Sequence, residues 1–386
     1  KKKHEYRWLG LSSVITLLFP FVFFHSRMAL IDSLFSSLLV SAIVAWIVLI
    51  QSKFRGLAFG LLLGLAFWTK TPALFILPLP LISSLLFDRN KSSFIQTTIA
   101  YISSFVMIAI LKINVWFPSL FSRSEDFSFS ISQLIHGHVE QIPSNAVTLL
   151  HWLIAYQGWL LMIIAVFSVG LAYRKKDYAI VLFFMVTIIY ILPFIILGKV
   201  ISPRYYLPLG LLLPILAAYV LSKLPKLWQY LGTVMLIISF LPMDLGLLMK
   251  PLDVQFPELD QHQYLMDWSS GIGIAESSQY FETQAAKQKI KILTEGYFGT
   301  LPDGLFVYLG HSPYWHNIEI VGVGGLASSD FTKEIKKAHN QKLYYIGNEN
   351  RIDFNFRNKL NLIKTYPKVG DAVNAPPLQV FEIVNQ

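Results

Sequence analysis

A series of long apolar runs is the feature that most constrains how this chain can fold. Each run approaches the length of about 20 residues that an α-helix needs to cross a bilayer. Apolar residues make up 54% of the 386 residues and charged residues only 14%, whereas soluble domains carry about 25% charged residues. The composition therefore excludes an ordinary soluble fold and predicts a polytopic α-helical membrane protein.

We expect about nine spans within residues 1–250, joined by polar loops. The third and fourth runs meet at Lys70, whose charge is unfavourable at the middle of a bilayer, so we interpret them as two separate spans. The expected spans begin near Leu9, Asp32, Gly56, Pro72, Phe94, Leu149, Tyr178, Tyr205 and Leu227.

Lys and Arg are distributed unevenly between the loops, and this asymmetry predicts the orientation. A cytoplasmic N-terminus places about thirteen of them inside and about six outside. With an odd number of spans, residues 251–386 then lie on the extracytoplasmic side of the plasma (inner) membrane. The net charge of +9 follows from this topological pattern, so we expect no binding to nucleic acid.

Residues 251–386 have the mixed composition of a soluble domain. Strands are expected at 290–293, 318–323, 342–346, 360–365 and 378–384, and helices at 277–287 and 331–340. The alternation of strands and helices predicts a small α/β domain with a partly parallel sheet. Binding an acceptor, gating a cavity and stabilising the fold are all roles open to this domain.

Charged and ionisable side chains concentrate at the expected outer ends of the spans and in the outer loops. Ionisable groups at a membrane are costly, so such a cluster indicates a functional site. The residues are Arg27, Asp32, Lys70, His136, His138, Glu140, Lys199 and Arg204. In the structural alternative, Asp32 caps a helix and Lys70 and Arg204 only anchor their spans at the interface.

Three segments carry a resemblance to a known family: 26–32 (SRMALID), 64–72 (GLAFWTKTP) and 202–208 (SPRYYLP). In order and approximate spacing they resemble the GT-C membrane glycosyltransferases of the family 39 and 83 branch. This branch includes protein O-mannosyltransferases and the bacterial lipid A aminoarabinose transferase. The resemblance implies transfer of a sugar from a polyprenyl-phosphate-linked donor to a hydroxyl of a protein, lipid or glycan at the outer face of the membrane.

This reaction leaves negative charge on the lipid phosphate, which fixed cations would stabilise. Lys70, Lys199 and Arg204 are the candidates for the donor phosphate, with Arg27 as a further cation. Arg suits a bidentate phosphate contact, and Lys suits a point-charge contact.

Asp32 matches an acidic position of the family that helps to hold a metal, and we also assign it to the catalytic group. The resemblance implies a histidine partner in the large outer loop, for which we prefer His138 to His136. Imidazole and carboxylate ligands suit Zn²⁺ or Mn²⁺.

The main catalytic base of the family lies in an earlier outer loop. The sequence begins at Lys1, and the resemblance implies that two further spans and this base precede it. We therefore expect the chain to be an N-terminally truncated fragment, inactive without the upstream loop.

Two other function classes remain open. A multispan transporter or flippase would place ionisable residues near the bilayer midplane, where this sequence has few. A membrane-anchored scaffold or sensor would need only the outer α/β domain, and it would not require the cations at the span ends.

Overall fold

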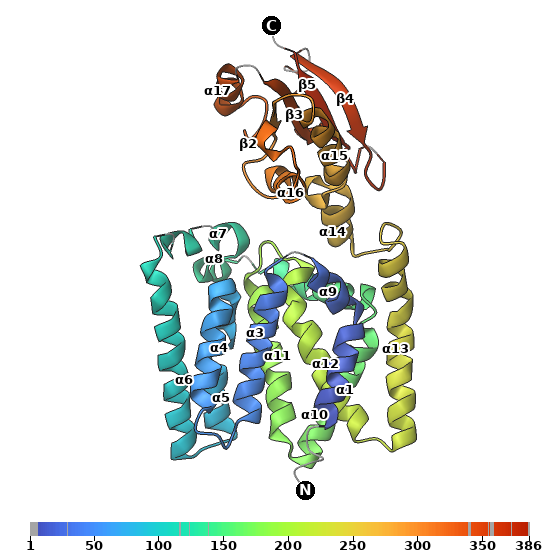
Figure 1. Cartoon of the computed structure of the whole chain (residues 1–386). Coiled ribbons are helices and arrows are strands. Elements are labelled where there is room, and N and C mark those ends of the chain that lie inside the picture. The colour runs from blue at the N-terminus through green and yellow to red at the C-terminus, as the bar shows by residue number, and fades with distance from the viewer. Residues whose placement is uncertain are drawn as a thin grey trace. The chain divides into compact units, whose positions relative to one another are not determined.

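Two units of different architecture make up the chain, Lys1–Pro257 and Glu258–Gln386. Figure 1 shows the first as a bundle of helices and the second as a sheet with helices packed on it. The structure is a computed structural model that describes residues 7–28, 30–115, 117–122, 124–137, 139–338, 341–353, 355, 359–371 and 373–384.

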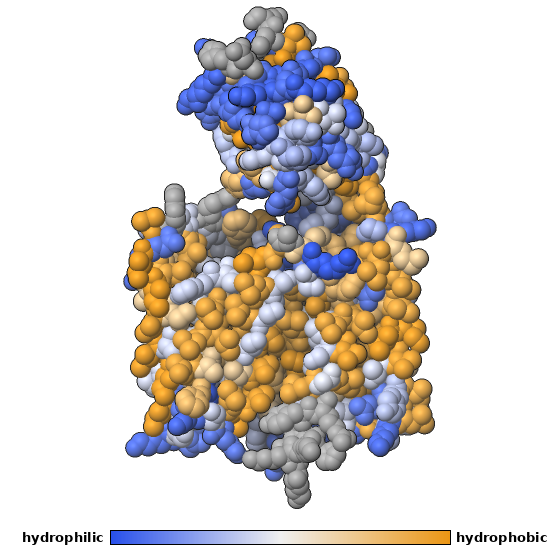
Figure 2. All heavy atoms as spheres, in the orientation of Figure 1, coloured by the Kyte–Doolittle hydropathy of each residue, from blue (hydrophilic) through white to orange (hydrophobic). Residues whose placement is uncertain are grey.

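The first unit is built from apolar helices that alternate in direction. Figure 1 shows α7, α8 and α9 at one end of this bundle, which we call the pocket end. Figure 2 shows hydrophobic residues along its flank and hydrophilic residues towards its ends. The elements are α1 (Arg7–Leu18), α2 (Pro20–Arg27), α3 (Asp32–Val48), α4 (Arg55–Thr69), η2 (Thr71–Ile76), α5 (Leu79–Leu86), α6 (Lys91–Ile110), η3 (Leu111–Ile113), η4 (Phe117–Phe121), α7 (Ser124–Phe127), α8 (Ile131–Ile135), α9 (Gln141–Ala155), α10 (Trp159–Lys175), α11 (Tyr178–Leu197), η5 (Pro203–Tyr206), α12 (Leu207–Ser222) and α13 (Lys226–Met249).

Several of these helices are long and apolar enough to cross a membrane. Among the described residues four helical segments meet this condition, and the number rises to six if each of two bent pairs is one span. The pairs are α1 with α2, bent by 65°, and α9 with α10, bent by 113°. The helices α3, α4 and η2–α5 are apolar but shorter. The expectation of a multispan helical protein is confirmed in this coarse form, and nine spans stays a prediction.

The expected boundary near Leu149 is wrong, because a sharp turn divides that run. Helix α9 already begins at Gln141 and ends at Ala155, and α10 starts at Trp159. A Cβ atom on Gly158 would lie 2.7 Å from the carbonyl oxygen of Leu153, so the turn requires glycine there. Hydrophobicity continues through the turn, and for this reason the apolar run alone did not reveal it.

A row of glycines lets α4 pack closely against α6 and sets the position of α4 along α6. Gly56, Gly60 and Gly64 follow one another at helical spacing, and Cβ atoms on them would lie 1.9–2.3 Å from atoms of α6. Small residues permit this close approach of membrane helices. Near the pocket end the indole Nε1 of Trp68 donates to the carbonyl oxygen of Met107 at 2.8 Å. The end of α4, which Lys70 follows, is thereby held on α6.

The second unit is an α/β domain with a five-stranded sheet in the order β2-β1-β3-β5-β4. Strand β1 pairs in parallel with β2 and β3, and β5 pairs antiparallel with β3 and β4. The partly parallel sheet expected from the sequence is thus present. Its elements are α14 (Glu258–Gln261), α15 (Ile274–Ala285), β1 (Ile290–Thr294), α16 (Thr300–Leu309), β2 (Ile318–Gly322), α17 (Ser329–Lys337), β3 (Lys342–Asn348), β4 (Leu360–Tyr366) and β5 (Leu378–Ile383).

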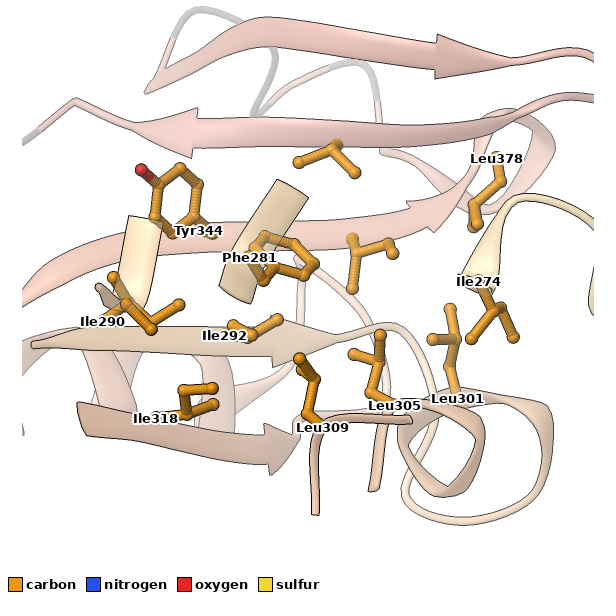
Figure 3. Close-up of a cluster of buried hydrophobic side chains, with 13 residues drawn as sticks. Ile274, Phe281, Ile290, Ile292, Leu301, Leu305, Leu309, Ile318, Tyr344 and Leu378 are labelled. Atoms are coloured by element: carbon orange, nitrogen blue, oxygen red, sulfur yellow. The ribbon is translucent and has the colours of Figure 1, made fainter. Parts of the chain in front are cut away.

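Two hydrophobic clusters lie on opposite faces of this sheet. Figure 3 shows one of them, in which Phe281 of α15 and Leu305 of α16 pack near Ile292 of β1. The next residue of β1, Leu293, belongs to the other cluster with Phe331 of α17, as the alternation of side chains along a strand requires. Helix α16 was not expected from the sequence. Of the helix expected at 331–340, residues 339 and 340 lie outside the described residues.

A buried polar network joins the carboxyl ends of β1 and β3. The Glu295 carboxylate accepts hydrogen bonds from the Asn348 main-chain N–H at 2.6 Å and from its side-chain amide at 2.5 Å. The Lys368 ammonium donates to the side-chain oxygen of Asn348 and, at 2.8 Å, to the Asp267 carbonyl oxygen. Burial raises the pKa of Glu295 and lowers the pKa of Lys368 to about 8. The network therefore fastens the segment that enters this unit onto the sheet.

The lowered pKa of Lys368 predicts that the second unit becomes more stable at alkaline pH. Between pH 8 and the ordinary lysine pKa of 10.5, the unfolded chain binds more protons than the folded chain, so the free energy of unfolding rises with pH. We expect the wild type to gain up to about 3 kcal/mol over this range relative to Lys368→Gln. The free energy of unfolding of the second unit can be measured in both proteins by proteolysis of the full chain in detergent at increasing urea concentrations. Parallel pH profiles of the two proteins would contradict this prediction.

Candidate functional site

The centre of the candidate site is an ion pair between two helix ends. Asp32 is the first residue of α3, and Lys70 is the extended residue that ends α4 before η2. The Lys70 ammonium donates to the Asp32 carboxylate at 2.5 Å, and only 4% of the Asp32 side chain is exposed. The N-cap residue of α3 is Ile31 and Asp32 is the first residue inside the helix, so Asp32 does not occupy the capping position, and its carboxylate pairs with Lys70.

A second cation reaches this place from the short helix η5. Within η5, Arg204 and Tyr205 are neighbours, and the Arg204 guanidinium carbon lies 5.6 Å from the centre of the Tyr205 ring. The Lys70 ammonium lies 5.1 Å from the same ring centre. Cations are attracted to aromatic faces at such distances. Lys70 and Arg204, two of the cations that the sequence singled out, therefore both lie next to the Tyr205 ring.

An apolar pocket of about 500 Å³ opens beside Lys70 and Tyr205. Its walls come from η2, from the pocket-end loop around α7 and from the last turns of α11. The lining residues are Lys70, Thr71, Pro72, Phe75, Leu120, Phe121, Ser124, Phe127, Ser128, Pro193, Phe194, Leu197, Gly198, Val200 and Tyr205. A mostly apolar cavity with a few convergent polar groups is typical of a ligand site. Cationic groups beside apolar walls suit a molecule with an anionic head and a hydrocarbon chain.

Main-chain hydrogen bonds pin the pocket-end loop to the end of α11. The Phe129 N–H donates to the Leu197 carbonyl oxygen at 2.7 Å, and the Lys199 N–H donates to the Phe127 carbonyl oxygen at 2.9 Å. The Lys199 ammonium donates to the Glu125 carbonyl oxygen at 2.8 Å. Lys199 thus supports the loop and is not among the residues that line the pocket.

Two other sequence candidates, Arg27 and His136, are not among the residues that line this pocket. Arg27 is exposed, and its guanidinium lies 5.0 Å from the ring of Phe23. His136 is also exposed, and its Nδ1 lies 2.7 Å from the Ser132 carbonyl oxygen. His138, the preferred metal ligand of the sequence interpretation, lies outside the described residues.

The metal site expected at Asp32, His136 and His138 stays a prediction, because His138 lies outside the described residues. No three His, Cys, Asp or Glu among the residues that the structure describes gather into a group able to hold a metal ion. Asp32, the carboxylate expected to bind the metal, already accepts a hydrogen bond from Lys70. We therefore derive no step of the chemistry through Zn²⁺ or Mn²⁺.

Sequence reasoning missed the aromatic part of the site. Tyr205 belongs to the segment 202–208 that carried the resemblance, so a signal for it was present. Phe75 and Phe194 lie within long apolar runs, where nothing distinguishes a pocket wall from a lipid-facing residue. The buried residue Tyr190, whose hydroxyl contacts the main chain of Tyr205, was hidden in the same way.

Comparison with known proteins identifies the fold. No family model matches the sequence, and no curated protein matches it significantly. The structure is similar to the crystal structure of ArnT from Cupriavidus metallidurans bound to undecaprenyl phosphate, with a TM-score of 0.51. The match has 14% sequence identity and covers 98% of this chain and 80% of that one. ArnT is a lipid A aminoarabinose transferase of the GT-C class, so the resemblance read from the sequence is confirmed at the level of the fold.

The ion pair predicts strong energetic coupling between Asp32 and Lys70. Removing one partner leaves the other charge poorly solvated, whereas removing both does not. We expect Asp32→Ala and Lys70→Ala each to destabilise the protein, and the double variant to be more stable than the sum of the two by about 1–3 kcal/mol. Denaturant unfolding in detergent measures this cycle. Additive effects would show that the two side chains do not form the pair.

Proposed function

We propose that this protein transfers a sugar from a polyprenyl-phosphate-linked donor to an acceptor hydroxyl. The observation that carries the proposal is the meeting of Lys70 and Arg204 at the Tyr205 ring, beside an apolar pocket. Similarity to ArnT supports it, because that structure contains undecaprenyl phosphate. The pocket end would face the outside of the membrane, in line with the distribution of Lys and Arg between the loops.

In this proposal the two cations stabilise the leaving group. The acceptor hydroxyl attacks the anomeric carbon and gives its proton to a general base. The bond from that carbon to the phosphate oxygen breaks, and its electron pair stays on the phosphate. Negative charge therefore grows on the lipid phosphate during the reaction, and positive groups already held in place lower the barrier. Lys70 would supply a point charge, and Arg204 would supply the planar group that fits a phosphate.

Asp32 would act on the phosphate only through Lys70. One hydrogen of the Lys70 ammonium is bound by Asp32, and an ammonium has three to donate. The remaining hydrogens are available to phosphate oxygens. The carboxylate thereby orients Lys70 beside the apolar pocket and pairs its charge, where a lone cation would be costly.

The experiment that tests this function measures binding of undecaprenyl phosphate to the full chain in detergent. We expect Lys70→Ala and Arg204→Ala each to weaken binding about tenfold or more, because each loses a charge-assisted contact with the phosphate. Undecaprenol, which has the same chain and no phosphate, should bind the variants as it binds the wild type.

A matched control is Lys112→Ala, which removes an exposed lysine of η3 that does not line the pocket. It should bind undecaprenyl phosphate like the wild type. An equal loss in this variant, or an equal loss of undecaprenol binding in the other two, would contradict the phosphate role. Binding of the lipid phosphate does not require a general base, so this experiment tests the phosphate site independently of turnover.

A further inference from the structure

Tyr190 links the apolar wall of the pocket to the turn that carries Arg204. It lies in α11 with no exposed surface, and its hydroxyl donates a hydrogen bond of 2.7 Å to the carbonyl oxygen of Tyr205. Its ring centre lies 5.4 Å from that of Phe194 and 6.4 Å from that of Phe75, and both of these residues line the pocket.

The same wall also contacts the turn through an aromatic stack. The rings of Phe194 and Tyr205 are nearly parallel, with 21° between their planes and 6.1 Å between their centres. This stack limits tilting of the Tyr205 ring, but it does not fix the main chain. The Tyr190 hydrogen bond acts on the main chain itself, at the residue that follows Arg204.

We infer that Tyr190 is a positioning residue for the phosphate end of the pocket. Helix η5 is one short turn, in which the Tyr205 N–H donates to the Ser202 carbonyl oxygen at 3.0 Å. The bond from Tyr190 fastens this turn to α11 from outside. It thereby sets the distance from Arg204 and the Tyr205 ring to Lys70. The inference rests on the proposed function, since it assigns a residue that tunes the same phosphate site.

The position of the bond explains why a hydroxyl is placed inside an apolar helix. A buried hydroxyl is retained at low cost only when it has a hydrogen-bond partner. Phenylalanine would fill the same space between Phe75 and Phe194 without that requirement. Compared with phenylalanine, tyrosine adds only the hydrogen bond to the Tyr205 carbonyl oxygen. The role of the hydroxyl can therefore be tested separately from that of the ring.

The decisive variant is Tyr190→Phe, which keeps the ring and removes only the hydroxyl. We expect the Kd for undecaprenyl phosphate to rise about threefold to tenfold, the range for one lost hydrogen bond. The Kd for undecaprenol should not change, because the apolar walls remain. Hydrogen exchange of the peptide covering residues 202–207 should become faster in the absence of ligand.

Thr187→Val is the matched control. Thr187 lies about one turn earlier in α11, is also buried, and its hydroxyl donates to the Phe183 carbonyl oxygen at 2.8 Å. The variant loses a buried hydrogen bond of the same helix without touching the turn. It should change neither the Kd for undecaprenyl phosphate nor the exchange of residues 202–207.

The readouts separate this inference from the proposed function. Wild-type exchange and wild-type affinity in Tyr190→Phe would overturn the inference, and so would equal effects of Thr187→Val. If the wild type failed to bind undecaprenyl phosphate, the proposed function would fall. Faster exchange in Tyr190→Phe alone would then still support the tie between α11 and the turn.

Discussion

The ion pair between Lys70 and Asp32 is the interaction on which the pocket end of the bundle depends. Both charges lie where apolar helices begin or end, and little of the Asp32 side chain is exposed. Breaking such a pair is costly because one charge stays behind without a partner. The pair joins α3 to the end of α4, and it leaves the Lys70 ammonium facing the Tyr205 ring. The cationic part of the candidate site follows from this arrangement.

Two rigid supports hold the cations of this site at a defined separation. The row of glycines and the Trp68 hydrogen bond fix α4 on α6, and Lys70 follows directly after α4. On the other side, the Tyr190 hydroxyl and the Phe194 ring fix the turn that carries Arg204. A site supported by helices in this way keeps its geometry better than one carried by loops alone. The mobile part of a ligand would then be its chain, in the apolar pocket.

Sequence patterns predicted a large part of the architecture and a smaller part of the site. The strands of the second unit follow from alternating apolar residues, and all those expected overlap strands of the structure. Helix α16 was missed because Pro302 and Gly304 lie inside it and argue against a helix. The break before Trp159 was missed because the residues around it are as apolar as the helices. Lys199 was grouped with Lys70 by its place at a helix end, but its ammonium binds a loop carbonyl instead.

The sequence by itself determined that this chain is a multispan helical protein and that a small α/β unit follows. It also determined which charged residues lie at the ends of the helices. These properties depend on local composition and periodicity. The tertiary structure decided which of those charges meet. Lys70 and Asp32 are 38 residues apart, and Tyr190 reaches Tyr205 from another helix. Such contacts depend on the rotation of each helix about its axis and on its neighbours in the bundle, which are set by packing between distant segments.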